Sequence, residues 1–255
     1  MKPNIPVLFQ KTKNENIIIP LGLDCEPAFK LSFYKKDFDS YPFAWSYPLD
    51  REKMASSLAD LSGLLEGDPF QFFGHGRMLA FSKYRVSFHI RLSPDSEAFT
   101  PVKSDELEEL KSRLSHLIQK QANAYASGKP LVFIMKIHGS SFDQDKHFLF
   151  FVEKTLQSQC KGSFCFLPVF ATNEINPKQY RNLTTANTFP VFVKTFWPFE
   201  DQSNVFKGDR TGWLRILKRI TKGSAMRYWY STSFPIRFIL SPWVKIRSKL
   251  RRKQR

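Results

Sequence analysis

The chain has 255 residues, of which 42% are hydrophobic and 26 are phenylalanine, a composition that excludes a disordered chain and suffices to build a buried core. No segment reaches the roughly 18 uncharged apolar residues of a spanning helix, and the first residues lack a signal-peptide core, so we expect a cytoplasmic protein. The net charge is +16, and it is unevenly distributed: 15 Lys or Arg and a single acid follow residue 206, which leaves the rest nearly neutral.

The apolar pattern along the chain predicts alternating strands and helices. We expect strands at 17–21, 84–92, 131–137, 164–170 and 189–193, and helices at 26–35, 50–66, 104–126 and 145–159. This alternation predicts an α/β fold with a mostly parallel sheet flanked by helices, in which 17–21, 84–90, 131–137 and 164–169 share one sheet. We expect a single α/β domain over residues 16–206, followed by a basic, aromatic C-terminal extension over residues 207–255.

Cys25 lies at the junction between the first predicted strand and the first predicted helix. The apolar run ends at Pro20 and Gly22, and Pro27 suits the first turn of a helix. At a helix N-terminus the unpaired N–H groups and the helix dipole favour a thiolate over a thiol, and the same N–H groups suit an oxyanion hole. The position therefore predicts a nucleophile, while a small, inert core cysteine is the alternative interpretation.

Two short motifs in this region resemble a known family. LGLDCEPAFKL is followed by DSYPFAW, and a strand-like YRVSFHIRL comes later. These motifs resemble the bacterial proteins described as papain-like cysteine peptidases, also called DUF1796, over residues 16–140. The matching positions are Leu21, Gly22, Cys25 and Ala28 in the first motif, and Tyr41, Pro42, Phe43 and Trp45 in the second.

The resemblance implies a cysteine hydrolase with a histidine on a later strand, which here points to His89. The second motif departs from the family at Ala44, where the family has an aspartate. If that carboxylate orients the histidine, this chain has lost or replaced it.

Nucleophilic cysteine chemistry needs a base and a group that orients the base. Beyond His89, His138 follows a predicted buried strand, at the edge where open α/β sheets collect their sites, and His75 lies between two glycines. His116 and His147 lie in or near predicted helices and are interpreted as surface residues. The sequence leaves the orienting group open among four candidates: Asp24, Asp39, Asp209 and Asn173.

No metal or cofactor is expected. Cys25, Cys160 and Cys165 lack the spacing of a metal site. The sequence contains no Walker A, GxGxxG or HExxH motif.

The C-terminal segment, residues 207–255, combines basic residues with aromatic ones. Trp213, Trp229 and Trp243 lie among Lys and Arg in apolar stretches too short to span a bilayer. This pattern predicts attachment to an anionic membrane surface at the cytoplasmic face. Nucleic-acid binding and a solvated tail are the alternatives, because the same charges serve either.

Three functional interpretations follow. The first is a cysteine-dependent hydrolase or acyltransferase at the membrane face, acting on a glycan or an acyl compound in surface-glycan metabolism. The second is a non-catalytic protein that binds an anionic ligand at the N-terminus of the first helix. The third is a nucleic-acid-binding protein whose basic segment does the binding.

Overall fold

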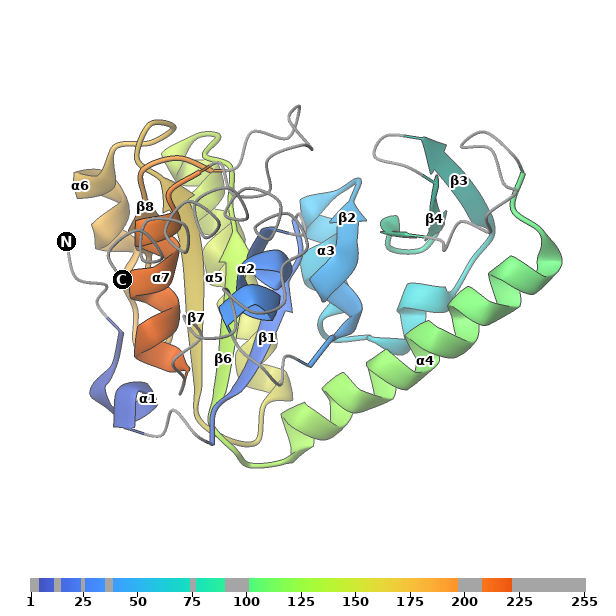
Figure 1. The fold of residues 1–255 in the computed structure, drawn as a ribbon, viewed down its shortest axis with the longest axis horizontal. Helices are drawn as coiled ribbons and strands as arrows, with labels where there is room; N and C mark the ends of the chain where they lie inside the picture. The colour runs from blue at the N-terminus through green and yellow to red at the C-terminus, as the bar shows by residue number, and fades with distance from the viewer. Residues whose placement is uncertain are drawn as a thin grey trace, which may run out of the picture.

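The computed structural model describes residues 5–11, 15–23, 26–34, 39–73, 77–89, 101–196 and 208–221. Its centre is a four-stranded parallel sheet in the order β1-β6-β7-β8 (Figure 1). The strands are β1 (Ile17–Leu21), β6 (Leu131–Lys136), β7 (Phe164–Ala171) and β8 (Val191–Val193). The predicted α/β fold with a parallel sheet is therefore confirmed.

The parallel strands are apolar without alternation because both faces of the sheet are covered. All residues of β6 and β7 are buried. On one face Ile18 and Val132 pack with α1 (Val7–Lys11), α2 (Glu26–Tyr34) and α7 (Arg210–Ile220). On the other face Ile19 and Phe133 pack with α5 (Phe142–Gln159) and part of α4 (Ser104–Ala126). The result is a three-layer arrangement (Figure 1).

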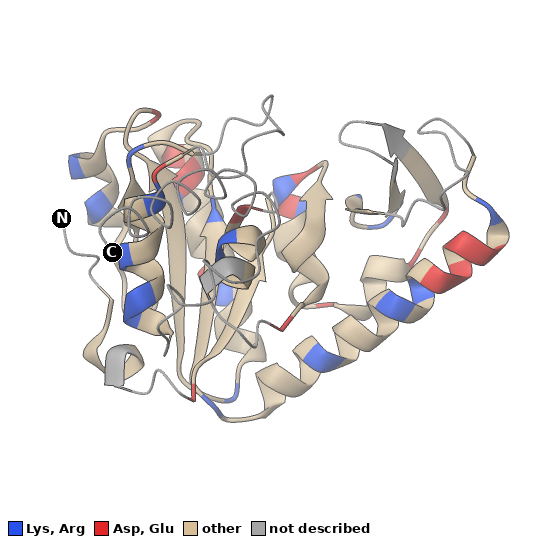
Figure 2. Ribbon diagram, in the orientation of Figure 1, with Lys and Arg blue, Asp and Glu red and all other residues tan. Residues whose placement is uncertain are grey.

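Local side chains stabilise the N-terminal ends of the two long helices, α4 and α5. The first turn of α4 carries Asp105 and Glu106, which complement the positive end of the helix dipole (Figure 2). Helix α5 starts three residues earlier than predicted, because the Ser141 hydroxyl accepts a hydrogen bond from the Gln144 N–H and caps the helix.

The prediction that 84–90 shares a sheet with the other strands is wrong. This segment forms β5 (Val86–His89) in a separate antiparallel sheet, ordered β2-β5-β4-β3. Its other strands are β2 (Ser46–Pro48), β3 (Pro69–Phe73) and β4 (Arg77–Phe81). The alternating pattern of this segment is typical of antiparallel strands, whereas a strand inside a parallel sheet is apolar throughout. A tight turn, in which Arg85 takes a φ of 55°, folds β5 back onto β4.

The predicted helix at 50–66 is also shorter than expected. Helix α3 (Arg51–Ser57) starts at the predicted cap, Asp50, and a separate 3-10 turn, η2 (Ser62–Leu65), follows it. The Asp60 carboxylate accepts hydrogen bonds from the Gly63 N–H and from the Lys83 ammonium group. These bonds stabilise the turn and keep the helix from continuing.

Helix α7 is packed into the α/β domain, although its residues belong to the C-terminal segment, 207–255, that was predicted to extend from that domain. Its apolar side, formed by Trp213, Ile216, Leu217 and Ile220, is buried against the sheet beside α1 and α2. Its basic residues lie on the outer side (Figure 2). Among the described residues, no helix is both long and apolar enough to cross a membrane.

Candidate functional site

Cys25 lies outside the described residues, as does Asp24 before it, and the structure describes Leu23 and Glu26 on either side of this pair. Strand β1 ends at Leu21, and α2 begins at Glu26, the residue after Cys25. The position between a parallel strand and the start of a helix agrees with the sequence prediction for its surroundings.

The two sequence motifs that carry the family resemblance pack against each other. A Cβ atom on Gly22 would lie 2.3 Å from the Phe43 carbonyl oxygen, so only glycine allows this approach. The second motif forms the 3-10 turn η1 (Pro42–Trp45), and the Trp45 ring meets the Phe29 ring of α2 edge-on at 4.8 Å. Ala44 is only 1% exposed, so its side chain faces the interior.

A buried group of charges surrounds the start of α2. The Glu26 carboxylate is 1% exposed, accepts a hydrogen bond from Trp213 Nε1 at 2.9 Å and pairs with Lys136 Nζ at 3.1 Å. Lys30, one turn further along α2, lies 3.8 Å from the same carboxylate. Burial lowers the pKa of Lys30, and the Glu26 charge opposes that shift. We call Glu26, Lys30, Lys136 and Trp213 the Glu26 cluster.

His138 lies beside the Glu26 cluster, two residues beyond the end of β6. Its Nδ1 atom is 3.2 Å and 3.3 Å from the two carboxylate oxygens of Glu174, within hydrogen-bond distance. Its ring contacts the Phe196 ring at a centroid distance of 5.2 Å, and Lys136 Nζ lies 4.7 Å from the centre of that same ring. The side chain is 59% exposed, so the imidazole is accessible to a substrate.

The other histidines occupy different places. His89 ends β5 in the antiparallel sheet, and its backbone carbonyl accepts a hydrogen bond from Arg113 at 2.7 Å. Because Phe88 pairs with Ser46, the end of β5 lies next to η1. His75 lies outside the described residues, while His116 and His147 are exposed on α4 and α5.

Among the described residues, an acid that contacts a candidate histidine is Glu174, which sequence reasoning did not single out. Asp39 instead pairs with Lys120 at 2.8 Å, and Asp209 caps α7. Asn173 has no hydrogen bond among the described residues, and Asp24 lies outside them. The signal for Glu174 was its place three residues after the buried strand β7, which neighbours β6 in the sheet.

The remaining cysteines are structural. Burial raises the pKa of the Cys160 thiol to about 12, and burial also raises the pKa of Cys165, which is fully buried. Within the described part of the chain, no group of three or more His, Cys, Asp or Glu side chains is arranged to hold a metal ion.

Comparisons of the chain with models of protein families, with curated proteins and with solved structures found no match. The resemblance to the papain-like cysteine peptidases therefore remains a prediction from the two motifs.

Proposed function

We propose that this protein is a cysteine-dependent hydrolase or acyltransferase, with Cys25 as the nucleophile, His138 as the general base and Glu174 as the residue that positions His138. The observation that carries the proposal is the His138–Glu174 contact at 3.2 Å, linked through Phe196 and Lys136 to Glu26. His138, whose ring contacts the Glu174 carboxylate, therefore lies near Glu26, the residue that follows Cys25 in the chain.

The topology supports this assignment. β1, β6 and β7 are neighbours in the parallel sheet, and Cys25, His138 and Glu174 follow them in the same order. The carboxyl ends of parallel strands meet at one edge of the sheet, where open α/β folds bind their ligands. Three loops that follow three adjacent strands can therefore contribute one residue each to a single site.

The chemistry follows from these roles. With Nδ1 of His138 directed at Glu174, Nε2 is the nitrogen assigned to take the proton of the Cys25 thiol. The thiolate attacks the acyl carbon, and the carbonyl electron pair moves to oxygen. When that pair returns, the leaving group departs with the proton from His138, and a thioester remains. Water or an acceptor hydroxyl then attacks the thioester carbon while His138 takes its proton. The C–S bond breaks, and His138 returns the proton to the Cys25 sulfur. The acyl group leaves as a free acid when water attacks, as in a hydrolase, or as an ester when a hydroxyl attacks, as in an acyltransferase.

We propose the substrate and the membrane attachment separately from the catalytic residues. A glycan or an acyl compound at the cytoplasmic membrane face fits a basic, aromatic C-terminal segment. Because Trp213 is buried in the domain, membrane attachment would depend on residues 222–255, which contain ten Lys or Arg and no acid. The alternatives are binding of an anionic ligand at the start of α2 without chemistry, and binding of nucleic acid by the C-terminal segment.

The test is hydrolysis of 4-nitrophenyl acetate and of a small acyl thioester by the full chain. Cys25→Ser should abolish the burst of product, because the acyl-enzyme no longer forms. His138→Ala and Glu174→Gln should slow acylation by at least about tenfold. His116→Ala, which removes an exposed histidine from α4, is the matched control and should have no effect.

His89 remains the alternative base. If His89→Ala abolishes the burst while His138→Ala leaves it unchanged, the base is on the antiparallel sheet and the proposed pairing is wrong. If Cys25→Ser retains full activity, the proposed function itself fails.

A further inference from the structure

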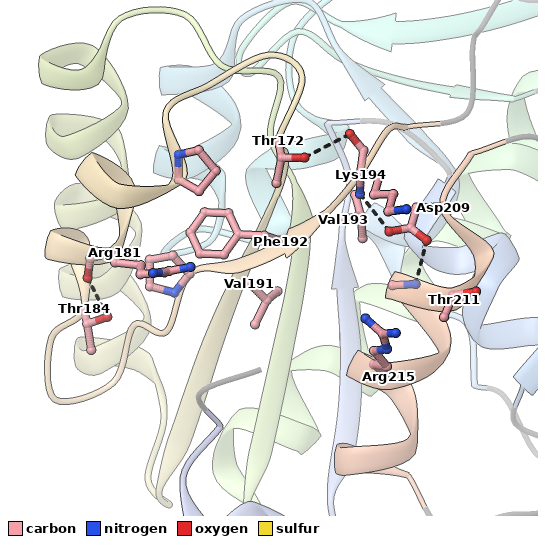
Figure 3. A pocket seen from close by; sticks show the side chains of 13 residues that line it. Thr172, Arg181, Thr184, Val191, Phe192, Val193, Lys194, Asp209, Thr211 and Arg215 are labelled. Carbon is pink, nitrogen blue, oxygen red and sulfur yellow. Dashed lines mark hydrogen bonds between the residues drawn. The ribbon is translucent and has the colours of Figure 1, made fainter. Parts of the chain in front are cut away.

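The outer edge of the parallel sheet borders a cavity that the proposed function does not use. Its volume is about 510 Å³, within the range of small-ligand and peptide sites, and it extends along β8 (Figure 3). The whole run Pro190–Lys194 lines it, with the 3-10 turn η3 (Arg181–Leu183) and helix α6 (Pro177–Tyr180) on one side and the start of α7 on the other.

The cavity lies over the edge of β8, and no strand among the described residues covers that edge. β8 is the last strand of the sheet, and the Val193 carbonyl oxygen faces inward, accepting a hydrogen bond from the Thr172 N–H at 2.8 Å. Backbone groups alternate direction along a strand, so the N–H and C=O of Phe192 face outward. None of the described strands pairs with this outer edge.

The open stretch of edge is short and has defined limits. At one end Pro190 has no N–H to donate. At the other end the Lys194 N–H is taken by the Asp209 carboxylate at 2.7 Å, which also caps α7 through the Gly212 N–H at 2.8 Å. An added segment can therefore pair with Phe192 over about three residues, roughly 10 Å of extended chain.

The side chains around this edge are basic. Arg181 lies on the η3 side with its guanidinium group 5.9 Å above the Phe192 ring, and Arg215 lies on the α7 side. Figure 3 shows these two residues on opposite sides of β8, with Lys194 near its end. Among the described residues that line the cavity, the one acid is Asp209, and its carboxylate accepts hydrogen bonds from the Lys194 and Gly212 N–H groups.

We propose that this cavity binds an acidic peptide segment in an extended conformation, as a fifth strand beside β8. The Phe192 N–H and C=O pair with the peptide backbone, as in other cases of strand addition to an open edge. Successive side chains of an extended peptide point to opposite faces, so two consecutive acidic residues reach Arg181 and Arg215 on the two sides. The inference is independent of the proposed acyl-transfer activity.

The test is binding of a fluorescein-labelled Thr-Val-Glu-Glu-Val-Thr peptide to the full chain, followed by fluorescence anisotropy. Arg181→Gln and Arg215→Gln should each weaken binding about fivefold, the scale of one exposed charge pair. The matched controls are Lys178→Gln on α6 and Lys218→Gln on α7, which remove the same charge from exposed positions outside the cavity. These controls should change affinity less than twofold.

Two further measurements separate strand addition from charge attraction alone. A peptide with the same sequence and N-methyl groups on its two central amides cannot pair with Phe192, and it should lose binding. Hydrogen exchange should show that the parent peptide protects the Phe192 amide. If the methylated peptide binds as well as the parent, or if the lysine controls weaken binding as much as the arginine variants, the proposal is overturned. If inorganic phosphate at matched ionic strength displaces the peptide with an affinity equal to that of the peptide, the cavity is an anion site and strand addition is wrong.

Discussion

Replacing Trp213 with phenylalanine tests whether α7 is an integral part of the α/β domain. The Trp213 side chain is fully buried, and its Nε1–H donates to the Glu26 carboxylate at 2.9 Å. Phenylalanine keeps most of the apolar contact but leaves the buried carboxylate without this donor. A hydrogen bond to a charged group contributes about 1.5–3 kcal/mol, and the void left by the smaller ring adds about 1 kcal/mol.

The loss of about 3 kcal/mol should lower Tm by about 6–12 °C for a chain of this length. Thermal unfolding followed by circular dichroism measures it. Trp45→Phe is the matched control, because the Trp45 Nε1–H donates to the neutral Ser40 hydroxyl at 3.3 Å in a part-buried site. The control should cost about 1 kcal/mol. Equal Tm values for the two variants would refute the reasoning that a buried, charge-assisted bond holds α7 in place.

Two other predictions follow from the packing. Asp145→Ala should destabilise the protein by about 3 kcal/mol, because the fully buried Asp145 carboxylate accepts hydrogen bonds from Arg51 at 2.9 Å and Tyr180 at 2.7 Å. Denaturant unfolding measures this loss. The control Asp143→Ala, at an exposed position in the same first turn of α5, should change stability by no more than about 0.5 kcal/mol. Removing residues 222–255 should leave the fold intact and reduce sedimentation with phosphatidylglycerol vesicles. Removing residues 208–255 should instead unfold the domain, because the face of the sheet that α7 covers is then exposed. Unchanged sedimentation after the shorter deletion would count against a membrane role for residues 222–255.

The parallel sheet could be predicted because its strands are buried on both faces. Strands such as β6 and β7 read as continuous apolar runs bounded by turn residues, and this local pattern was sufficient. The membership of β5 could not be predicted, because sheet membership depends on which strands it meets in space. Its alternating pattern signalled an antiparallel partner, but the pattern alone did not identify β2 and β4.

The amphipathic pattern of α7 was ambiguous for a physical reason. A stripe of apolar residues at helical spacing fits a bilayer interface as well as a protein core. The structure shows that Trp213 and its neighbours cover one face of the sheet, and no local feature of the sequence distinguishes that from membrane binding.

The candidate site was predictable only in part. The strand–turn–helix context of Cys25 and the place of His138 after a buried strand both come from local pattern. The Glu174 contact and the pairing of Glu26 with Lys136 join residues 36 and 110 positions apart in the chain, and such contacts depend on the order of the strands. Glu174 can be identified as the partner of His138 only when β7 is known to pair with β6.

The most direct test of the central claim is the pH dependence of thiol alkylation in the native protein, measured by mass spectrometry after brief exposure to iodoacetamide. Cys160, with its pKa raised to about 12 by burial, and the fully buried Cys165 should stay unmodified near neutral pH. We predict that the alkylation rate of Cys25 rises with pH and reaches its plateau before pH 7. In His138→Ala the plateau should be reached only at higher pH. A Cys25 rate that climbs about tenfold per pH unit up to the ordinary thiol pKa of about 8.5, equally in both proteins, would contradict the account.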